Sequence, residues 1–565
     1  MKIVAERSKY HKFALYYDYS PDRVEFCRNL KDSFGWNKFS FEVDGKLKRW
    51  VFSDSLFIPV IQERFPEVQI EPNVEDVVKK EQSWANEQKR KNDEIDSVRT
   101  KKDTDFNVKG LKKSLYAYQK VGVEFLLASG GRAIVADSMG LGKSAEALAF
   151  IKHSGFKRTL VVCPASVKFA WENEVKKWTQ LSSVIIDSKT DLSKIDFSIQ
   201  VWLINYDILR KHLPQLSKIR FDCLVGDECQ FIKSTQAIRT KSFRQISKDI
   251  NSIILLSGTP LLSRPSELFS LLNIIDRKTW DNPYDFYRRY CNMRQTRWGM
   301  DISGASNIDE LHARIRRYFI RRDKTEVLTE LPPKNFISVP VELNKEFAEK
   351  YKSAANDLAT YLRQYSGKQA PEIAKALNAE KLTQLNVLRQ LNAMGKIDAA
   401  IELIESVLDA GEKVLVFSSF VEPLESLKEY FGNKAVILTG KTPIEDRRQI
   451  VETFQSNKKV PIFLGGVKSA GIGITLTAAR NVLFLDRSWN PADMQQAQDR
   501  AHRIGTEHES INIYQLDVKD SIDDDMKDIL EHKQGIFDRV IDGKIGASVA
   551  SEAMASAVKR VLKNY

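Results

Sequence analysis

Long hydrophobic runs and paired cysteines are both missing from this sequence of 565 residues. The sequence has no stretch of about eighteen apolar residues, which is the length that a membrane-spanning helix needs. The opening residues, MKIVAERSKYHK, lack the apolar segment of a secretory signal. The five cysteines are scattered, without a CxxC pair or metal-ligand spacing, so we expect neither a disulfide framework nor a zinc site. We therefore expect an intracellular protein, neither secreted nor bound to a membrane. It would act in the cytoplasm or nucleoid of a bacterium or phage, or in a eukaryotic nucleus.

Acidic residues are fewer than basic ones. Lys and Arg together number 87 against 75 Asp and Glu, which gives a formal net charge of +12. Such an excess is typical of proteins that bind a polyanion. A merely basic soluble protein would show the same balance, so composition leaves both interpretations open.

The pattern of residues changes twice along the chain. Residues 1–72 alternate aromatic and basic residues and predict a small α+β module, whereas 74–108 are densely charged and suit an exposed helix or linker. Beyond them, short runs rich in β-branched residues alternate with amphipathic helices, which indicates doubly wound parallel sheets. The interval 262–400 is predicted to be helical. The apolar runs form two clusters, RAIVA, TLVVC, QVWLI, CLVGD and SIILL, then KVLVF, AVILT, PIFLGG, NVLFLD and INIYQL, so we expect two such domains.

Residues 136–148, ADSMGLGKSAEAL, join a predicted strand to a predicted helix. Gly140 and Gly142 would let backbone N–H groups face phosphate oxygens, Lys143 would reach the β- and γ-phosphates, and the Ser144 hydroxyl would bind Mg²⁺. Asp137 stands where the general phosphate-loop pattern has glycine, at the edge of that cradle. The simpler alternative is a glycine-containing turn with an incidental lysine.

Adjacent acids follow another predicted strand, in FDCLVGDE. Asp227 would hold Mg²⁺ and Glu228 would act as the base that orients the attacking water. Two acids in a surface turn would look the same when taken alone. A third strand, SIILLSGTP, ends in Ser257 and Thr259, which could sense the γ-phosphate.

The distal segment NPADMQQAQDRAHRIG places Gln496, Arg500 and Arg503 at spacings of four and three. These spacings predict that all three side chains lie on one helical face. Arginines in such a place can stabilise transition-state charge during phosphoryl transfer. Surface ion pairs with Asp493 and Asp499 are the alternative.

The ordered set of motifs resembles the Swi/Snf family of superfamily 2 ATPases, which are double-stranded DNA translocases. The resemblance covers about 109–520 and also implies an aspartate at position 137. Three departures, which concern coupling more than hydrolysis, are Ser138 for the usual Glu, Cys229 and Gln230 in the tail of the DEx-His box, and Thr506 for Gln. The motifs that carry the resemblance are YQKVGVEFLL, DSMGLGKS, LVVCPASV, DECQ, LLSGTPLLSRPSELFSLL, RRDKTEVLTELPPK, VLVFSSF, GGVKSAGIGITLTAARNVLFLD and WNPADMQQAQDRAHRIG.

The resemblance implies ATP and Mg²⁺ as cofactors, bound in a cleft between two RecA-like lobes, with Gln119 at the adenine edge and Arg500 and Arg503 supplied by the second lobe. Duplex DNA would be gripped through its phosphates, with little sequence preference. The implied nucleotide contacts are Gln119, Asp137, Ser138, Met139, Gly140, Leu141, Gly142, Lys143, Ser144 and Gly473, and the implied DNA contacts are Ser166, Lys168, Lys468 and Ser469. Each DNA contact is also compatible with an ordinary surface residue.

The residue pattern and the resemblance together divide the chain into six parts. They are a module at 1–72, a charged linker at 73–108, RecA-like lobe 1 at 109–333, a helical protrusion at 334–400, RecA-like lobe 2 at 401–545 and a tail at 546–565.

The N-terminal segment is similar to the HepA-related domain of annealing helicases, whose pattern ends in a basic hairpin such as KRWVFS. This similarity implies that Lys48, Arg49 and Trp50 bind DNA at a junction, through phosphate contacts and aromatic stacking. Alternation also puts Trp50 and Phe52 on one face, where both would be core residues instead.

Three functions compete on these grounds. The first is an ATP-driven translocase, monomeric on double-stranded or branched DNA, that reanneals or remodels forks and displaces bound proteins. The second is a motor that acts on RNA polymerase or another replication, repair or transcription complex. The third is a DNA-binding scaffold whose altered DECQ box has lost turnover.

Overall fold

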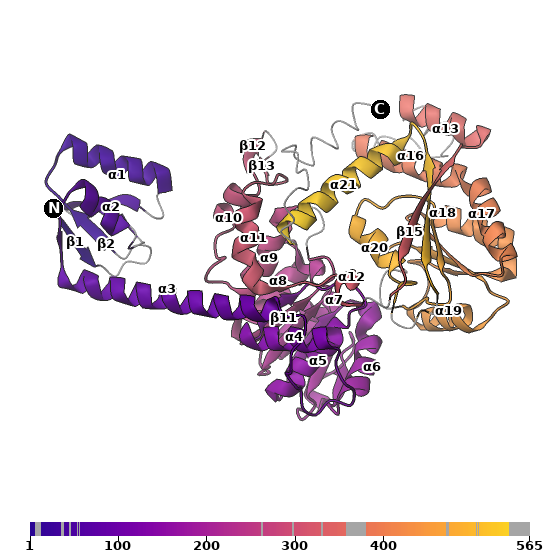
Figure 1. Cartoon of the computed structure of the whole chain (residues 1–565), viewed down its shortest axis with the longest axis horizontal. Helices are drawn as coiled ribbons and strands as arrows, with labels where there is room; N and C mark the ends of the chain where they lie inside the picture. The colour runs from indigo at the N-terminus through magenta and orange to yellow at the C-terminus, as the bar shows by residue number, and fades with distance from the viewer. Residues whose placement is uncertain are drawn as a thin grey trace. The chain divides into compact units, whose positions relative to one another are not determined.

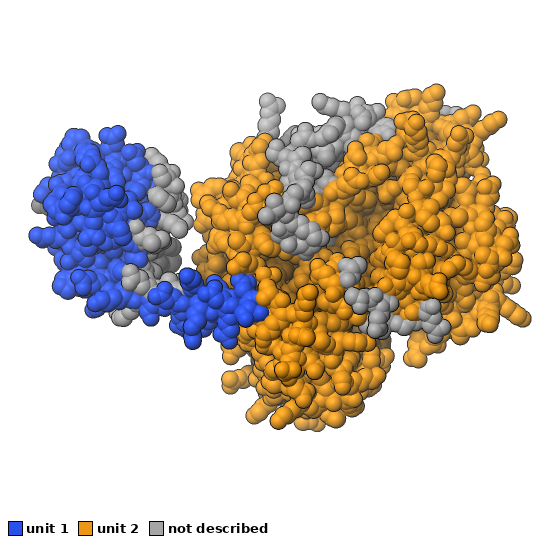
Figure 2. All heavy atoms as spheres, in the orientation of Figure 1, with its two compact units in different colours: residues 1–97 blue, residues 98–565 orange. Residues whose placement is uncertain are grey.

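The computed structural model contains two compact units, residues 1–97 and 98–565 (Figure 2). No helix among the residues that the structure describes is long and apolar enough to span a bilayer. The structure describes residues 1–541 apart from 6–12, 35–38, 45–46, 53–54, 56, 261–263, 297–298, 329–330, 358–379, 470–473, 504–505 and 507. Gly473 and the predicted tail at 546–565 therefore lie outside the described residues.

The first unit is a five-stranded sheet in the order β3-β4-β2-β1-β5, with helices beside it (Figure 1). The charged segment after it forms one helix, α3, from Pro72 to Arg99. The other elements are β1 (Lys2–Ala5), β2 (Phe13–Tyr16), α1 (Pro21–Phe34), β3 (Phe39–Asp44), β4 (Leu47–Phe52), α2 (Phe57–Arg64) and β5 (Gln69–Ile70).

Trp50 belongs to the core of this first unit. Only 3% of its surface is exposed, its ring packs against Phe39 and Phe41, and its indole N–H donates to the Tyr17 hydroxyl at 2.7 Å. Phe52 on the same strand face is fully buried. The prediction of a stacking platform at Trp50 is therefore wrong, because alternation along β4 turns this ring inward with Phe52.

The second unit begins with a seven-stranded, fully parallel sheet in the order β14-β6-β11-β10-β7-β9-β8. The five predicted apolar runs of the first cluster all form strands of this sheet. Its strands are β6 (Arg132–Val135), β7 (Thr159–Cys163), β8 (Ser183–Ile185), β9 (Val201–Asn205), β10 (Cys223–Asp227), β11 (Ser252–Leu256) and β14 (Phe319–Ile320). Its main helices are α4 (Ala117–Ala128), α5 (Lys143–Ser154), α6 (Lys168–Trp178), α7 (Tyr206–Leu216), α8 (Ile238–Ile246) and α9 (Leu268–Ile275).

Two edge strands, β8 and β14, were not predicted. Both are short, and β14 lies in the interval that was expected to be helical. Its two residues gain strand geometry only by pairing with Ile134 and Val135 of β6, a contact that the local pattern does not reveal. The rest of that interval contains α10 (Pro283–Tyr290), the hairpin β12 (Arg294–Thr296) and β13 (Gly299–Asp301), α11 (Ile308–Ile315) and α12 (Lys324–Val327).

A six-stranded, fully parallel sheet follows, in the order β15-β20-β19-β16-β18-β17. Residues 334–341, expected in a helical protrusion, instead form β15 and pair with β20 along eight residues, so they belong to this second sheet. The strands are β15 (Lys334–Val341), β16 (Val414–Ser418), β17 (Ala435–Leu438), β18 (Ile462–Gly466), β19 (Asn481–Phe484) and β20 (Ile511–Val518). The helices are α13 (Lys345–Asn356), α16 (Glu380–Gly395), α17 (Ile397–Asp409), α18 (Val421–Phe431), α19 (Ile444–Ser456), α20 (Pro491–Gln498) and α21 (Ile522–Val540).

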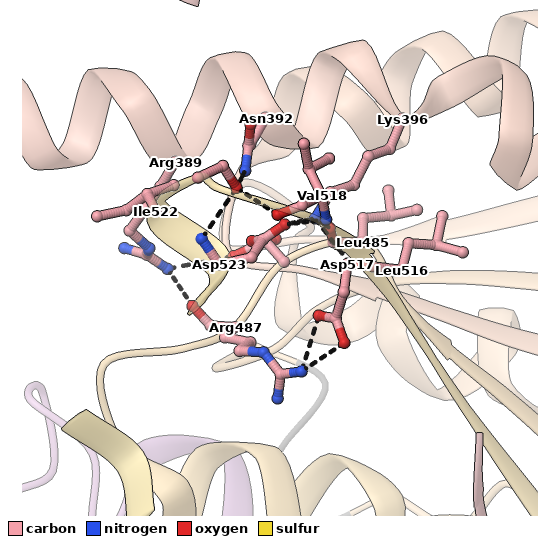
Figure 3. Close-up of polar contacts among 12 residues, drawn as sticks. Arg389, Asn392, Lys396, Leu485, Arg487, Leu516, Asp517, Val518, Ile522 and Asp523 are labelled. Atoms are coloured by element: carbon pink, nitrogen blue, oxygen red, sulfur yellow. Dashed lines mark hydrogen bonds and ion pairs between the residues drawn. The ribbon is translucent and has the colours of Figure 1, made fainter. Parts of the chain in front are cut away.

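A buried ion pair fastens the end of α16 to this sheet (Figure 3). The fully buried Lys396 ammonium group contacts Asp523 at 2.6 Å and donates to the carbonyls of Leu485 and Leu516, at 3.0 and 2.8 Å. Leu485 directly follows β19 and Leu516 lies within the neighbouring β20, so a single cation contacts both strands and also the first turn of α21.

Helix α21 contributes to two hydrophobic cores. Its beginning packs with α16 through Ile522, Met526 and Ile529. Its end packs into the core of the first sheet through Phe537 and Val540 (Figure 1). The last helix that the structure describes in the expected lobe 2 segment 401–545 is therefore shared with lobe 1.

We expect Trp50→Ala to destabilise the first unit by about 3–5 kcal/mol, because it removes a buried indole from the core. Hydrogen exchange of the β2 and β4 amides in the full chain, measured against urea concentration, gives the change. Tyr19→Ala is the matched control, because Tyr19 is 84% exposed. Unchanged hydrogen exchange in Trp50→Ala would contradict a core role for this ring and would favour a role in binding.

Candidate active site

The phosphate-loop candidate lies between β6 and α5. Gly140 and Gly142 have φ of +87° and +85°, and Gly142 is the N-cap of α5. This left-handed region favours glycine, and a Cβ at Gly142 would lie only 2.3 Å from the Gln119 side-chain nitrogen. The loop thus brings its backbone close to the helix N-terminus, as phosphate binding requires.

Lys143 begins α5 and turns back over this loop. Its ammonium group donates to the Asp137 carbonyl at 2.8 Å and to the Ser138 carbonyl at 3.4 Å. Burial lowers its pKa, although the carboxylates of Glu228 and Asp137 oppose that effect. Ser144 is the next residue of the helix, so the ammonium and hydroxyl groups expected at phosphate and Mg²⁺ lie at one helix end.

Gln119 joins α4 to the same loop. Its side-chain oxygen accepts from the Tyr116 N–H at 3.0 Å, and its nitrogen donates to the Leu141 carbonyl at 2.9 Å. Met139 and Leu141 are buried beside it in the loop. Adenine recognition by Gln119 stays a prediction, but its place at the loop is clear.

Asp137 does not face the phosphate cradle. Its carboxylate is fully buried and is paired with the Arg322 guanidinium, which also contacts Glu146 at 2.9 Å. Arg322 also donates its backbone N–H to Asp137 at 2.9 Å. An aspartate replaces the usual glycine because a buried arginine needs a carboxylate at this position. The two carboxylates raise the pKa of Arg322, against the lowering effect of burial.

Neither Arg322 nor Glu146 was singled out from the sequence. Arg322 is 185 residues from Asp137 in the chain, and the only local signal was a charged segment, RRDK, directly after the apolar residues of β14. Glu146 sits among the alanines of α5, where a charge looks exposed although it is fully buried.

Asp227 and Glu228 lie at the carboxyl end of β10, as expected. Asp227 accepts from the Trp171 indole N–H at 2.8 Å and from the Glu228 N–H at 3.0 Å. Burial, reinforced by Glu228, raises the pKa of Asp227 to about 7. Glu228 has φ of 51°, an uncommon value for a residue with a side chain.

Gln230 connects the acidic pair to the third motif. Its amide nitrogen donates to the Glu228 carboxylate at 2.8 Å, and its oxygen accepts from the Ser257 hydroxyl at 2.7 Å. Ser257 in turn accepts from the Thr259 N–H at 3.0 Å. The unusual Gln therefore forms a continuous chain from Glu228 to Thr259. Coupling through Ser257 and Thr259 stays a prediction, now with a defined route.

The second-lobe arginines do not share one helical face, so that prediction is wrong. Helix α20 ends at Gln498, and Arg500 and Arg503 lie in the turn and bend that follow it. Arg500 donates to the Ile474 carbonyl at 3.0 Å, and Arg503 donates to the Thr475 hydroxyl at 3.0 Å. The side chains are positioned by the segment before β19 rather than by the helix. Gln496 remains within α20 and is partly buried.

Both arginines nevertheless lie near the first-lobe groups. A Cβ on Gly140 would lie 3.7 Å from the Arg503 side chain. Burial and the neighbouring Arg503 lower the pKa of Arg500 to about 9, while Glu228 opposes this change. Burial also lowers the pKa of Arg503, against the opposing effects of Asp499 and Glu228. Arg500 and Arg503 of the second lobe and Glu228 of the first lobe thus belong to one electrostatic site.

Three charged groups join the two sheets beside this site. Lys324, two residues after Arg322, contacts Asp499 at 3.1 Å, and Lys334 contacts the same carboxylate at 2.9 Å. Although burial raises the pKa of Asp499, the two ammonium groups bring it below its usual value. Asp499 directly precedes Arg500, so the ion pair fixes the start of the arginine segment.

The structure also contradicts the predicted DNA contact at Lys168. The Lys168 ammonium group is buried and paired with Asp187, with a further bond to the Ile186 carbonyl at 3.2 Å, so it is not available to phosphate. Lys168 is the first residue of α6 and lies on the buried face of that helix, which a single sequence position does not reveal. Ser166 is partly buried, Lys468 is exposed, and Ser469 donates to the Gly466 carbonyl at 3.2 Å. These three stay predictions.

Arg49 and Lys48 lie on β4 of the first unit. Arg49 donates to the Tyr16 hydroxyl at 2.8 Å and pairs with Glu42 at 3.5 Å. The Lys48 side chain lies outside the described part of the chain.

The residues present fit Mg²⁺ and a nucleoside triphosphate. The left-handed glycines leave room where a Cβ would collide, and the Asp227 carboxylate is buried with a raised pKa that a divalent cation would reverse. Ser144 and Asp227 would hold the metal, which is the donor set of a phosphate-loop site. No cluster of three or more His, Cys, Asp or Glu side chains suited to a metal occurs among the described residues.

Fold and site together define an ATPase built from two parallel-sheet lobes. A model of the SNF2-related domain matches residues 118–395, and a model of the helicase conserved C-terminal domain matches residues 395–505. The two matches adjoin and contain the phosphate loop, the acidic pair and both arginines. This chain therefore belongs to the Swi/Snf family of helicase-like ATPases.

Named relatives are similar over most of this chain. The DNA annealing helicase and endonuclease ZRANB3 of Bos taurus is 32% identical over 465 residues, which are 78% of this chain and 42% of that protein. A SWI/SNF-related matrix-associated actin-dependent regulator of chromatin subfamily A-like protein 1 homolog of Caenorhabditis elegans is 31% identical over 474 residues, 80% of this chain and 64% of that protein. The chain thus spans less than two thirds of either relative.

One solved structure, the Sulfolobus solfataricus SWI2/SNF2 ATPase core in complex with dsDNA, aligns with a TM-score of 0.39 and 25% identity. The alignment covers 80% of this chain and 98% of that chain.

We expect Arg322→Ala to destabilise the first lobe by about 3–5 kcal/mol, because it leaves two buried carboxylates without a countercharge. Adding Glu146→Gln should restore part of that loss by removing one of the charges. Urea-dependent hydrogen exchange of β6 and β14 measures both changes.

Arg288→Ala is the control for this pair, because Arg288 forms an exposed ion pair with Asp285 at 3.2 Å. Its removal should cost no more than about 1 kcal/mol. Parental stability of Arg322→Ala would contradict the assignment of Asp137 to a structural ion pair.

Proposed function

We propose that this chain is an ATP-hydrolysing translocase on double-stranded DNA that remodels or reanneals branched DNA, or displaces bound proteins, acting as a monomer inside the cell. The observation that carries the proposal is the composite site, in which the Arg503 side chain of the second lobe lies 3.7 Å from where a Cβ on Gly140 of the first lobe would be, with Arg500 beside it. A site divided in this way couples nucleotide chemistry to the relative position of two lobes, as a motor needs.

The side chains divide the chemistry among them. Lys143 and the glycine loop bind the phosphates, Ser144 and Asp227 hold Mg²⁺, and Glu228 accepts a proton from the attacking water. When bound, Mg²⁺ neutralises charge on the β- and γ-phosphates. Arg500 and Arg503 supply positive charge to the transferred phosphoryl group.

The Gln230 bridge favours an active enzyme over a scaffold. If the altered DECQ box had lost its role, the Gln230 amide would have no reason to contact both Glu228 and Ser257, at 2.8 and 2.7 Å. The bridge orients the Glu228 carboxylate and links it to the end of β11. It thereby supports hydrolysis and its communication to the rest of the first lobe.

DNA as the partner rests on the names of the relatives and on charge. ZRANB3 is described as a DNA annealing helicase, and the present chain has a net charge of +12. Contacts to phosphate would give strong salt dependence and little sequence preference. With Trp50 buried and Arg49 bonded to Tyr16 and Glu42, a junction-binding role of the first unit rests on phosphate contacts rather than stacking.

The test compares ATPase rates without DNA and with duplex, single-stranded and forked DNA. We expect duplex and forked DNA to stimulate turnover, and single-stranded DNA to do so much less.

Glu228→Gln should bind ATP normally but lose hydrolysis by about 10²–10⁴-fold, because it removes the base. Lys143→Ala should instead weaken ATP binding.

A turnover rate that does not respond to any DNA would contradict the proposed function. Parental hydrolysis by Glu228→Gln would contradict the assignment of the base alone. Stimulation only by a nucleoprotein complex, and not by naked DNA, would favour a motor for RNA polymerase or a similar assembly.

A further inference from the structure

A basic hollow lies on the second lobe, at the end of the sheet opposite the nucleotide site. It encloses about 860 Å³, and its lining includes Lys413, Lys434, Lys458, Lys459, Arg480 and His508. Among these residues, only Arg480 falls in a motif that carries the family resemblance.

The position of these residues follows from the topology. Lys413, Lys434 and Arg480 each directly precede a strand, namely β16, β17 and β19, and Lys459 lies shortly before β18. Because the strands are parallel, their amino ends gather at one edge of the sheet. The segment GGVKS, at the end of β18, lies at the opposite edge, roughly 15 Å away along five-residue strands.

Three of the cations are free to meet a ligand. Lys434, Lys458 and Lys459 are exposed, and none of them forms an ion pair within the described part of the second lobe. Exposed ammonium groups gathered around one hollow repel each other, and an anion relieves that repulsion.

The remaining charges are fixed in place. Lys413 donates to the carbonyls of Phe454 and Asn457, the latter at 2.9 Å, so its bonds go to neutral groups and its charge remains. Glu412, the one acidic side chain among the described residues of the lining, is held by Arg480 and by the Asn481 amide at 2.6 Å. The Glu412 charge is thus balanced by Arg480, and the lysines leave the hollow with an excess of positive charge.

We propose that this hollow binds the phosphodiester backbone of a nucleic acid segment that lies outside the motor cleft, which rests on the proposed function. Lysines act as point charges toward phosphate, and the described lining contains no Phe, Tyr or Trp ring to stack on a base. The surface therefore reads no sequence. It gives the second lobe a hold on a distant part of the same duplex or on another arm of a branched molecule.

The test uses the full chain with Lys434, Lys458 and Lys459 all changed to Glu. The control changes Lys194, Lys218 and Lys248 to Glu, which are exposed lysines of the first lobe. Both variants lower the formal net charge from +12 to +6, so they differ only in where the charge is changed. Affinity for a long duplex is measured against salt concentration, and ATPase activity is measured at saturating DNA.

We expect the hollow variant to bind the long duplex about ten-fold or more weakly at low salt. The slope of log affinity against log salt concentration should become shallower by about 0.9 for each phosphate that the variant no longer neutralises. Its ATPase activity at saturating DNA should equal the parent's, since no nucleotide-binding residue has changed. The control variant should keep the parental salt slope.

Equal effects of the two variants would overturn the proposal, because net charge alone would then explain them. An unchanged slope in the hollow variant, with a parent that DNA stimulates, would overturn this inference and leave the proposed function intact. If the variant keeps DNA binding but no longer binds a polyglutamate peptide that the parent binds, the hollow takes an acidic protein segment and the nucleic acid assignment is wrong.

Discussion

The charge of Arg322 is the constraint on which the nucleotide site depends. A guanidinium this deeply buried needs carboxylates around it, and Asp137 and Glu146 provide them from the strand-to-helix segment of the phosphate loop. Arg322 itself follows β14, the edge strand that pairs with β6. One side chain thus holds the loop, its helix and the exit from the first sheet in a single arrangement.

The same exit segment also sets the place of the second lobe. Lys324 pairs with Asp499, the residue before Arg500, while Arg322 holds the loop two residues earlier. Arg503 reaches the neighbourhood of Gly140 from the other side. The phosphate loop and the arginine segment are thus connected through the ion pairs of Arg322 and Lys324. The buried Lys396–Asp523 pair fixes the start of α21 to the second sheet, and the end of α21 packs into the core of the first sheet.

The sequence predicted the features that are local. Ten apolar runs became strands because β-branched runs bounded by turns form buried parallel strands, and GLGKS and DE fell at strand ends for the same reason. Partners distant in the chain could not be predicted, as the Arg322 network shows. Burial was misjudged for Lys168, since its pairing with Asp187 is not written in adjacent residues. For Trp50, alternation along β4 already offered the core position that the structure shows, and the similarity to a DNA-binding hairpin pointed the other way. The helix α20 ends earlier than the spacing suggested, and Arg500, which lies beyond its end, bonds to the Ile474 carbonyl.

The central claim is that hydrolysis needs arginines of the second lobe at a first-lobe site. Single-turnover hydrolysis by Arg503→Ala, with ATP affinity and DNA affinity measured on the same protein, tests it most directly. Arg503→Lys, which keeps the charge but not the guanidinium fork, is the matched variant. The account predicts that Arg503→Ala hydrolyses ATP about 10³-fold or more slowly, with ATP and DNA binding little changed. Impaired DNA binding with normal hydrolysis would contradict it, because Arg503 would then lie on the DNA path and not in the nucleotide site.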